Sequence, residues 1–227
     1  MKYSLSEEQQ IFQESVDNFI SKEYHLEMRR RLLSTEAGFS RKNWKKFSEL
    51  GWLGLTIDLN YGGMGGTMVD RAALMESLGK GLTLEPVLST AVKCTNIIQT
   101  SASKTQKQGF LPKIAAGDLL LAFGFAEPSS HYNLAYVATK ATRKKNIFQL
   151  NGKKIVVLNA SSADKIIVTA RTAGDIADSE GISLFILEKS TPGLSLNSYP
   201  TIDGQRASEI LLRDVEVNED NMIGHEG

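Results

Sequence analysis

The chain has 227 residues, of which 41% are apolar and 23% are charged, so it can bury a hydrophobic core and its length suits one large domain or two ordinary ones. Lys and Arg together number 26, as do Asp and Glu, so a net charge of zero gives no global attraction to nucleic acid or to an anionic membrane. The single cysteine, Cys94, excludes an internal disulfide framework and a cysteine-rich zinc site.

The N-terminal sequence gives no targeting signal. MKYSLSEEQQ lacks the apolar segment of a signal peptide. No run approaches the roughly 20 apolar residues that span a bilayer. Together with the lone cysteine, these features predict a cytoplasmic protein with no membrane span.

Helical periodicity runs from Leu5 to about Gly117. Ser6 and Gln9 have the spacing of a capping box, so a helix is expected to begin after Ser6. The apolar face of this helix consists of Phe12, Val16, Phe19 and Ile20.

Several more helices are predicted in this half. Ser40 suits the N-cap of a second helix, and Gly51 suits its C-terminus. Its apolar positions are Trp44, Phe47 and Leu50. The later predictions are a glycine-rich turn over 60–66, a helix that ends at Gly79, a helix over 85–100, and a helix from the capping box Ser103–Gln106 to Gly117.

After Gly117 the apolar period changes to two, which is typical of strands. The predicted strands are 119–126, 134–142, 146–150, 154–159, 164–171, 182–188 and 207–217. Turn signals at Asn151-Gly152, Pro192-Gly193 and Asp203-Gly204 separate some of them. The sequence therefore predicts an α+β chain, with an all-α domain at 1–117 followed by an antiparallel sandwich or small barrel at 118–227.

Motifs for metal binding or nucleophilic catalysis do not stand out. His25, His131 and His225 are far apart in sequence and lack ligand spacing. The neighbours Ser130 and His131 point to opposite faces if they lie in a strand, so their adjacency is poor evidence for a catalytic pair. The sequence also has no Gly-x-Ser-x-Gly motif, so neither chemistry is predicted.

Three other segments have competing explanations. NYGGMGG at 60–66 has the wrong spacing for a phosphate loop and favours a structural turn. The basic run KATRKK at 140–145 favours a solvated hairpin end over a nucleic-acid surface. FGFAEPSSHYNLAYVATKA at 123–141 is either a plain strand, turn and strand, or a turn built to hold a ligand.

The order of four segments resembles the N-terminal and middle domains of the acyl-CoA dehydrogenase family. The first two are LSEEQQIFQESVDNFI and FSELGWLGLTIDLNYGGMGGTMVDRAALMESLGKG. The third, FGFAEPSSHYNLAYVATKA, stands where the family has a Thr-Glu-Pro turn followed by Gly-Ser-Asp. The fourth combines NGKKIVVLNASSADKIIVTART with GQRASEILLRDVEVNEDNMIG and is similar to the remaining strands of the middle domain.

This resemblance implies a helical N-terminal domain, a β-barrel middle domain and a C-terminal four-helix domain. In the family, FAD lies between the last two domains and accepts a hydride from the acyl-CoA thioester, while a glutamate from the C-terminal part removes the α-proton. The resemblance also implies oxidation of an acyl-CoA to the 2,3-enoyl-CoA, a homo- or hetero-oligomer with a related subunit, and electron-transfer flavoprotein as electron acceptor. The chain ends at Gly227, so we expect a fragment with no catalytic base of its own and an incomplete flavin cleft and oligomer interface.

The chain departs from the family at the positions that face the flavin. Ala126 replaces the Thr of Thr-Glu-Pro, and Val156 and Leu158 replace the Trp and Thr of Trp-Ile-Thr. Tyr132 replaces the Ser of Gly-Ser-Asp. Each lost hydrogen bond costs about 0.5–1.5 kcal/mol. The resemblance assigns cofactor contact to Phe123, Phe125, Ala126, Tyr132, Val156 and Leu158, with backbone donors at 123–126.

The substrate positions also depart from the family. Ser208-Glu209-Ile210-Leu211 stands where the family has Ser-Asp-Thr-Arg, so the basic residue is lost. The resemblance assigns substrate contact to Tyr132, Ser208 and Glu209. The acyl tail is expected near Leu84, Val87, Val92 and Cys94, although packing within a helical core explains these residues equally well.

AEPSSHYNLAYVATKA, SADKIIVTARTAG and SYPTIDGQRASE resemble the small-subunit members of paired bacterial acyl-CoA dehydrogenases, the pimeloyl-CoA dehydrogenase small subunits. Two main hypotheses follow. The chain belongs either to an FAD-dependent acyl-CoA dehydrogenase or to a non-catalytic subunit that completes a hetero-oligomer. Oxidation of acyl-CoA with oxygen and simple acyl-CoA binding remain further alternatives.

Overall fold

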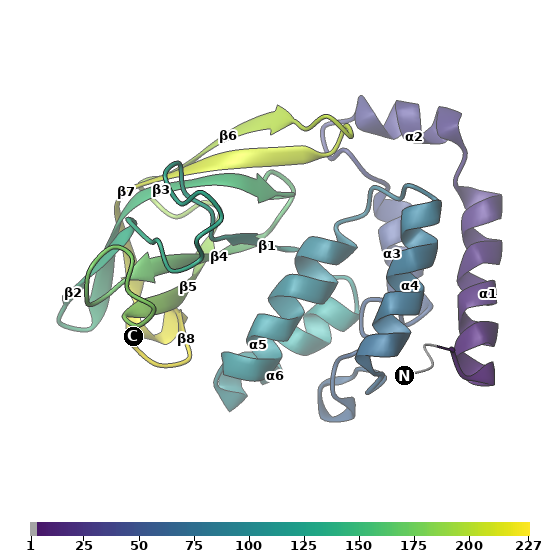
Figure 1. Ribbon diagram of the computed structural model, residues 1–227, viewed down its shortest axis with the longest axis horizontal. Helices are drawn as coiled ribbons and strands as arrows, with labels where there is room; N and C mark the ends of the chain where they lie inside the picture. The colour runs from purple at the N-terminus through teal and green to yellow at the C-terminus, as the bar shows by residue number, and fades with distance from the viewer. Residues whose placement is uncertain (1–3) are drawn as a thin grey trace. The chain divides into compact units, whose positions relative to one another are not determined.

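The structure is a computed structural model that describes residues 4–227, with helices in the first half of the chain and strands in the second (Figure 1). This order confirms the predicted fold class. Packing divides the chain into two compact units. Unit 1 consists of Met1–Glu85 with Leu111–Asp118, and unit 2 consists of Pro86–Phe110 with Leu119–Gly227. The domain boundary expected between 117 and 118 stays a prediction.

Unit 1 is built of helices around an aromatic core. Its elements are α1 (Glu7–Glu23), α2 (Leu26–Leu33), α3 (Arg41–Glu49), the short 3-10 helix η1 (Leu59–Tyr61) and α4 (Met68–Lys80). The helix α6 (Lys104–Ala115) contributes residues to both units. The centroid of the Phe47 ring lies 4.7 Å from that of Trp52 and 5.9 Å from that of Phe19. Phe47 and Trp52 are buried, and burial of such large rings contributes to the stability of unit 1.

The predicted helix starts at Ser6, Ser40 and Ser103 are confirmed. The Ser6 hydroxyl accepts the N–H of Gln9 at 3.2 Å, and the Gln9 side chain accepts the N–H of Ser6 at 3.0 Å. Ser103 and Gln106 exchange the same two bonds. The side chain of Ser40 caps α3. Each cap satisfies backbone donors that the first helical turn leaves unpaired.

Two helical segments differ from the predictions. The helix α2 was not predicted from the sequence, because it buries no residue and its N-cap His25 makes no side-chain cap bond. The helix expected over 85–100 begins instead as a π-helix, η2 (Leu88–Cys94), and continues as α5 (Thr95–Ser101). A π-helix is uncommon and often marks a functional site.

Unit 2 contains an eight-stranded sheet with the order β6-β7-β3-β2-β4-β5-β8, and β1 pairs with β4. The strands are β1 (Leu121–Gly124), β2 (Lys140–Lys144), β3 (Ile147–Leu158), β4 (Lys165–Arg171), β5 (Ile182–Glu188), β6 (Leu194–Pro200), β7 (Arg206–Asn218) and β8 (Met222–Ile223), with the 3-10 helix η3 (Glu219–Asn221) before β8. Most pairs are antiparallel, but β1–β4 and a single β2–β4 bridge are parallel. The order has two ends, β6 and β8, and among residues 4–227 no strand pairing joins these two ends into a closed barrel.

Several strand boundaries were wrong. Asn151-Gly152 is not a turn, because β3 runs through it while it pairs with β7. The hairpin turn lies at 145–146, where Lys145 has a φ of 57°. Only the last part of the segment predicted over 134–142 is a strand. The strand β6 was missed because much of LSLNSYP is polar and none of it is buried.

Buried side chains from the strands of the sheet form the hydrophobic core of unit 2. The rings of Phe148 and Phe185 have centroids 5.0 Å apart, and both side chains are fully buried. Alternate residues of β3 and β5 point into this core, as the strand period requires.

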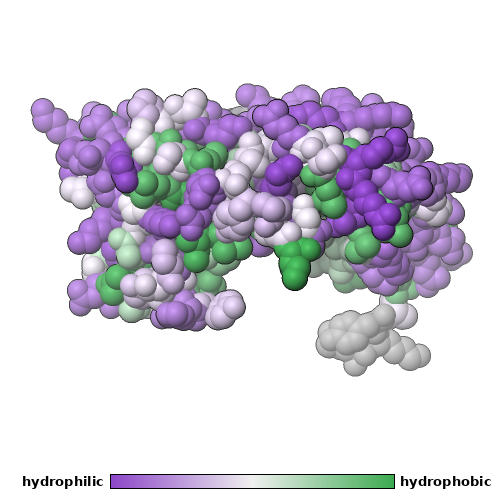
Figure 2. All heavy atoms as spheres, turned by 90° about the horizontal axis from the view of Figure 1, so that it is seen from above, coloured by the Kyte–Doolittle hydropathy of each residue, from purple (hydrophilic) through white to green (hydrophobic). Residues whose placement is uncertain are grey.

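On the face seen in Figure 2, hydrophilic residues predominate and the apolar patches between them are small.

Candidate functional site

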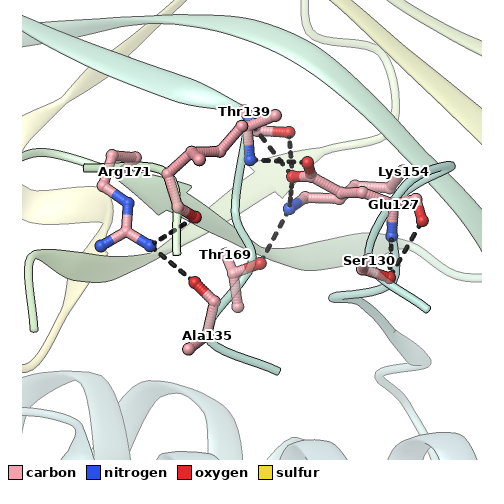
Figure 3. Close-up of polar contacts among 9 residues, drawn as sticks. Glu127, Ser130, Ala135, Thr139, Lys154, Thr169 and Arg171 are labelled. Carbon is pink, nitrogen blue, oxygen red and sulfur yellow. Dashed lines mark hydrogen bonds and ion pairs between the residues drawn. The ribbon is translucent and has the colours of Figure 1, made fainter. Parts of the chain in front are cut away.

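A corner that follows β1 gathers the polar groups of the 123–141 segment (Figure 3). Glu127 lies at this corner and is only 3% exposed. Its carboxylate accepts the backbone N–H of Ala138 at 2.7 Å and that of Thr139 at 3.0 Å. The Thr139 hydroxyl donates to the same carboxylate at 2.6 Å. Glu127 therefore closes the loop between itself and Thr139.

Lys154, in the middle of β3, completes this cluster (Figure 3). Its ammonium donates to Glu127 Oε1 at 2.5 Å and to the Thr169 hydroxyl at 2.8 Å. The side chains of Lys154 and Glu127 are 0% and 2% exposed. A charge is tolerated at such depth only when it is paired and hydrogen-bonded. The ion pair thus fixes the corner to β3.

The protonation of Glu127 follows from its partners. Burial acts to raise the pKa of the Glu127 carboxyl, but attraction to Lys154 and the hydrogen bonds from Lys154 and Thr139 outweigh it, so the pKa lies below its ordinary value. Burial lowers the pKa of Lys154, and attraction to Glu127 offsets part of that effect. Glu127 is therefore a carboxylate held by four donors.

The turn after Glu127 ends in left-handed backbone. The N–H and the hydroxyl of Ser130 donate to the Glu127 carbonyl at 3.1 and 3.0 Å. His131 and Tyr132 follow with φ of 41° and 68°. Residues other than glycine seldom adopt this backbone conformation outside tight turns and functional sites. Tyr132 is fully exposed, so its hydroxyl stands in solvent at the tip of the turn.

A second buried cation holds the loop that follows this turn. Arg171, at the end of β4, is 6% exposed. Its Nη2 donates to the carbonyl of Ala135 at 2.7 Å (Figure 3) and to that of Ile176 at 3.1 Å. Its Nη1 donates to the carbonyls of Asp178 and Glu180 at 3.0 and 2.5 Å. Arg171 therefore joins Ala135, in the chain before Lys140, to the loop that carries Ile176, Asp178 and Glu180.

A bulge in β3 lies beside the corner. The pairing of β3 with β7 shifts between Lys154, opposite Ile210, and Val157, opposite Ser208. The bulge places Val156 in left-handed backbone with φ of 52° and leaves its side chain 51% exposed. This conformation is strained for a β-branched residue, and strain of this kind concentrates at functional sites.

A backbone hydrogen bond joins the corner to the bulge. The N–H of Ile155 donates to the Ala126 carbonyl at 2.9 Å. The ring of Phe125 packs against that of Phe123, with centroids 5.2 Å apart. The structure therefore brings Phe123, Phe125 and Ala126 together at the base of the bulge that carries Val156.

The π-helix η2 borders the same group. The Ser89 hydroxyl donates to Asn159 Oδ1 at 2.7 Å and lies 3.5 Å from the Leu158 carbonyl. The Thr90 hydroxyl donates to the Leu121 carbonyl at 2.9 Å and accepts the Leu121 N–H at 3.0 Å. These contacts hold η2 against β1 and the end of β3, where Leu158 lies.

The predicted substrate residues on β7 have partners within the sheet. Ser208 is fully buried, and its hydroxyl lies 2.8 Å from that of Ser198 on β6. The Glu209 carboxylate pairs with Lys153 at 2.9 Å. The structure thus gives these two side chains contacts of their own, whereas the cofactor-side positions on β1 and β3 gather around the bulge.

The residues predicted near the acyl tail are mostly buried. Leu84, Val87 and Cys94 are 2%, 3% and 0% exposed, and Val92 is partly exposed. Burial also raises the pKa of the Cys94 thiol well above its ordinary value. These properties favour packing within the helical core.

Sequence reasoning missed the two buried cations of this site, Lys154 and Arg171. Lys154 stands at an inward position of β3, between the buried Leu150 and Val157. A lysine at an inward strand position needs a buried acid, and that requirement is the signal from which the pair with Glu127 could be found. Arg171 has no comparable signal because its partners are backbone carbonyls.

Across residues 4–227, no three His, Cys, Asp or Glu side chains lie in a group that could hold a metal ion. In the same described range, no helix is long and apolar enough to cross a membrane.

Two family models match the sequence: the acyl-CoA dehydrogenase N-terminal domain over residues 6–118 and the acyl-CoA dehydrogenase middle domain over 122–215. The probable acyl-CoA dehydrogenase YngJ of Bacillus subtilis is 33% identical over 99% of this chain and 60% of its own length. The mitochondrial isovaleryl-CoA dehydrogenase of Pongo abelii is 31% identical over 98% of this chain and 54% of its own length.

Solved structures share the fold. The ChsE4-ChsE5 complex from Mycobacterium tuberculosis matches with a TM-score of 0.87 and 28% identity, over 100% of this chain and 58% of that chain. The chain spans little more than half the length of the relatives that it matches. Both domain models, sequence similarity over nearly the whole of this chain and the shared fold agree, so the chain belongs to the acyl-CoA dehydrogenase family.

Proposed function

We propose that this chain is part of an FAD-dependent acyl-CoA dehydrogenase that oxidises an acyl-CoA thioester to the 2,3-enoyl-CoA. Membership of the family supports the reaction class. The observation that carries the proposal is the ion pair between Glu127 and Lys154, which holds Ala126 beside the strained bulge at Val156. Strained backbone concentrates at functional sites, which supports a functional role for this corner.

The residues at this corner offer a flavin apolar surface but few polar side chains. Phe123, Phe125 and the exposed Val156 offer apolar surface suited to a planar ring. The side chains of Ala126 and Leu158 carry no donor or acceptor, so polar contacts at this corner come from backbone N–H groups over 123–126. When bound, FAD supplies the hydride acceptor that the oxidation requires.

The chain's own residues orient the ligands. Glu127 and Lys154 set the position of the backbone at Ala126, because that backbone is tied to β3 by the Ile155 N–H. Tyr132 presents its hydroxyl at the tip of the turn, where we propose that it contacts cofactor or thioester. Ser208 and Glu209 remain proposals for substrate contact, and each must exchange its present partner to serve in this way.

The lack of side-chain donors at this corner favours a second candidate function. In this alternative, the chain completes a hetero-oligomer whose related subunit carries the flavin and the base. The aliphatic side chains of Ala126, Val156 and Leu158 support this alternative, since none of them bonds a flavin edge. The similar ChsE4-ChsE5 structure is a complex, which supports pairing with a related subunit.

Other features of the whole protein stay proposals of the same kind. Electron-transfer flavoprotein is the proposed electron acceptor, and the cytoplasm is the proposed compartment. We propose none of the residues of this chain as the catalytic base.

The visible absorption spectrum of the full-length protein, purified alone, tests the proposal. We expect a flavin band near one flavin per subunit, and we expect acyl-CoA to bleach that band when oxygen is absent. A colourless protein that gains flavin only with a related subunit would establish the second function. A colourless protein that stays colourless with every related subunit would contradict both.

A further inference from the structure

A buried arginine in unit 1 has no acidic partner. Arg71 is only 7% exposed and lies on the face of α4 that also buries Leu74 and Leu78. Its Nη2 donates to the Thr56 hydroxyl, but no carboxylate oxygen of residues 4–227 lies within 4.0 Å of its guanidinium. Since a buried cation is normally paired with an acid, Arg71 is an exception that needs an explanation.

The acids nearest to Arg71 along α4 already have other partners. The Asp70 carboxylate caps the start of α4 and accepts the side-chain amide of Gln9 at 2.9 Å. Glu76 pairs with Lys80 at 3.0 Å. Burial lowers the pKa of the Arg71 guanidinium, and no charge among residues 4–227 counteracts this effect. Because arginine keeps its proton at physiological pH, the described part of the chain leaves this charge uncompensated.

The glycine-rich turn at 60–66 holds Thr56 against Arg71. Gly65 and Gly66 donate their N–H groups, each at 2.8 Å, to the carbonyls of the two residues that flank Thr56. A Cβ at Gly66 would lie 2.7 Å from one of these carbonyl oxygens, which is too close for a side chain. The turn therefore fixes the hydroxyl that orients the guanidinium.

The other donors of Arg71 are available to a ligand. Within residues 4–227, the Thr56 hydroxyl is the only hydrogen-bond acceptor for this guanidinium, which carries several N–H groups. None of its nitrogens is among the side-chain atoms that lack both solvent contact and a partner. The unbonded N–H groups therefore reach the surface, and the 7% exposed fraction means that the opening is small.

We infer that Arg71 forms a second ligand site, in unit 1, which binds the carboxylate of a small organic anion such as formate or acetate. The planar guanidinium matches the two oxygens of a carboxylate. A phosphate site generally gathers several donors or cations, whereas here one cation stands alone. The small opening favours the smallest carboxylates. The site does not depend on the proposed function.

Saturation-transfer NMR on the small anions tests this site directly. The full-length protein is titrated with sodium acetate at constant ionic strength, and the signal of the acetate methyl protons gives the dissociation constant. We expect a saturable signal, and formate should displace acetate more readily than butyrate does. Arg71→Met should weaken acetate binding at least about tenfold, because it removes the cation that binds the carboxylate.

The controls separate the possible outcomes. Arg30→Met removes an exposed arginine from α2 and should leave acetate binding unchanged. Arg71→Lys keeps the charge but loses the planar fork, so it should bind acetate several-fold more weakly, and it decides the matter where Arg71→Met does not fold.

Three results would overturn the inference. They are no saturable signal in the wild type, acetate binding as tight in either Arg71 variant as in the wild type, and stronger displacement of acetate by inorganic phosphate than by formate. Neither added flavin nor thioester enters the measurement, so its result is separate from the success or failure of the proposed function.

Discussion

Two buried glutamates, one in each unit, have opposite environments. Glu127 in unit 2 meets the ammonium of Lys154, and its pKa lies below the ordinary value because that attraction outweighs burial. Glu85 in unit 1 is 6% exposed and accepts the hydroxyl of Tyr24 and the N–H of Ser40, the latter at 3.3 Å. No basic side chain within residues 4–227 forms an ion pair with Glu85, and burial raises its pKa to about 7.

The difference shows that depth alone does not decide the charge of an acid. Glu127 keeps its negative charge because a cation and three further donors surround it. Glu85 has only neutral donors, so it takes up a proton near neutral pH. The first glutamate is therefore a fixed part of the candidate site, whereas the second makes unit 1 sensitive to pH.

Removal of the cation at the corner should have the largest effect. Lys154→Met leaves the Glu127 carboxylate buried without its counter-ion, and we expect the free energy of unfolding to fall by about 3–5 kcal/mol. Chemical denaturation measures this change.

The neighbouring lysine provides a matched control for that variant. Lys153 pairs with Glu209, but both side chains are more than a third exposed. Lys153→Met should therefore cost no more than about 1 kcal/mol. Adding Glu127→Gln to Lys154→Met should restore part of the lost stability, because the stranded charge is gone. Equal effects of the two lysine substitutions would contradict the importance of the buried pair.

Titration of Glu85 should have the next largest effect. Its folded pKa of about 7 lies above the ordinary value of 4.5, so the folded state holds the proton more tightly than the unfolded state. The stability from this group is complete below about pH 4.5 and is lost as the pH rises through about 7, by up to about 3 kcal/mol. Glu85→Gln should remove that loss.

The measurement is the free energy of unfolding of both proteins at a series of pH values. The difference between wild type and Glu85→Gln isolates this group from all others that titrate. Glu8→Gln, at an exposed position of α1, is the control and should follow the wild-type curve. A wild-type curve parallel to that of Glu85→Gln would contradict the proposed titration.

The smallest expected effect comes from relieving the backbone strain at Val156. Val156→Gly relieves a left-handed β-branched residue whose side chain is half exposed, so the free energy of unfolding should rise by roughly 0.5 kcal/mol. Thermal denaturation measures this change. Val157→Gly, at the next and fully buried position, should instead cost several kcal/mol, roughly 2–4. A loss above about 1 kcal/mol in Val156→Gly would argue against strain.

The regular parts of this fold could be predicted because their signals are local. The capping pairs at Ser6 and Ser103 and the strand periodicity after Gly117 depend on residues a few positions apart. The course of β3 through Asn151-Gly152 could not be predicted, because pairing with β7 overrides the local turn signal. The contact between Lys93 and the Phe125 ring could not be predicted either, because the two residues are far apart in sequence.

The central claim is that Ala126 and Leu158 face the flavin and that neither offers it a hydrogen bond. The most direct test is fluorescence titration of FAD onto the flavin-free full-length protein. Ala126→Thr with Leu158→Thr supplies two hydroxyls, and we predict that FAD binds roughly tenfold to hundredfold more tightly. Ala138→Thr, at an exposed position of the same segment, should change nothing. An unchanged dissociation constant in the double variant would contradict the claim.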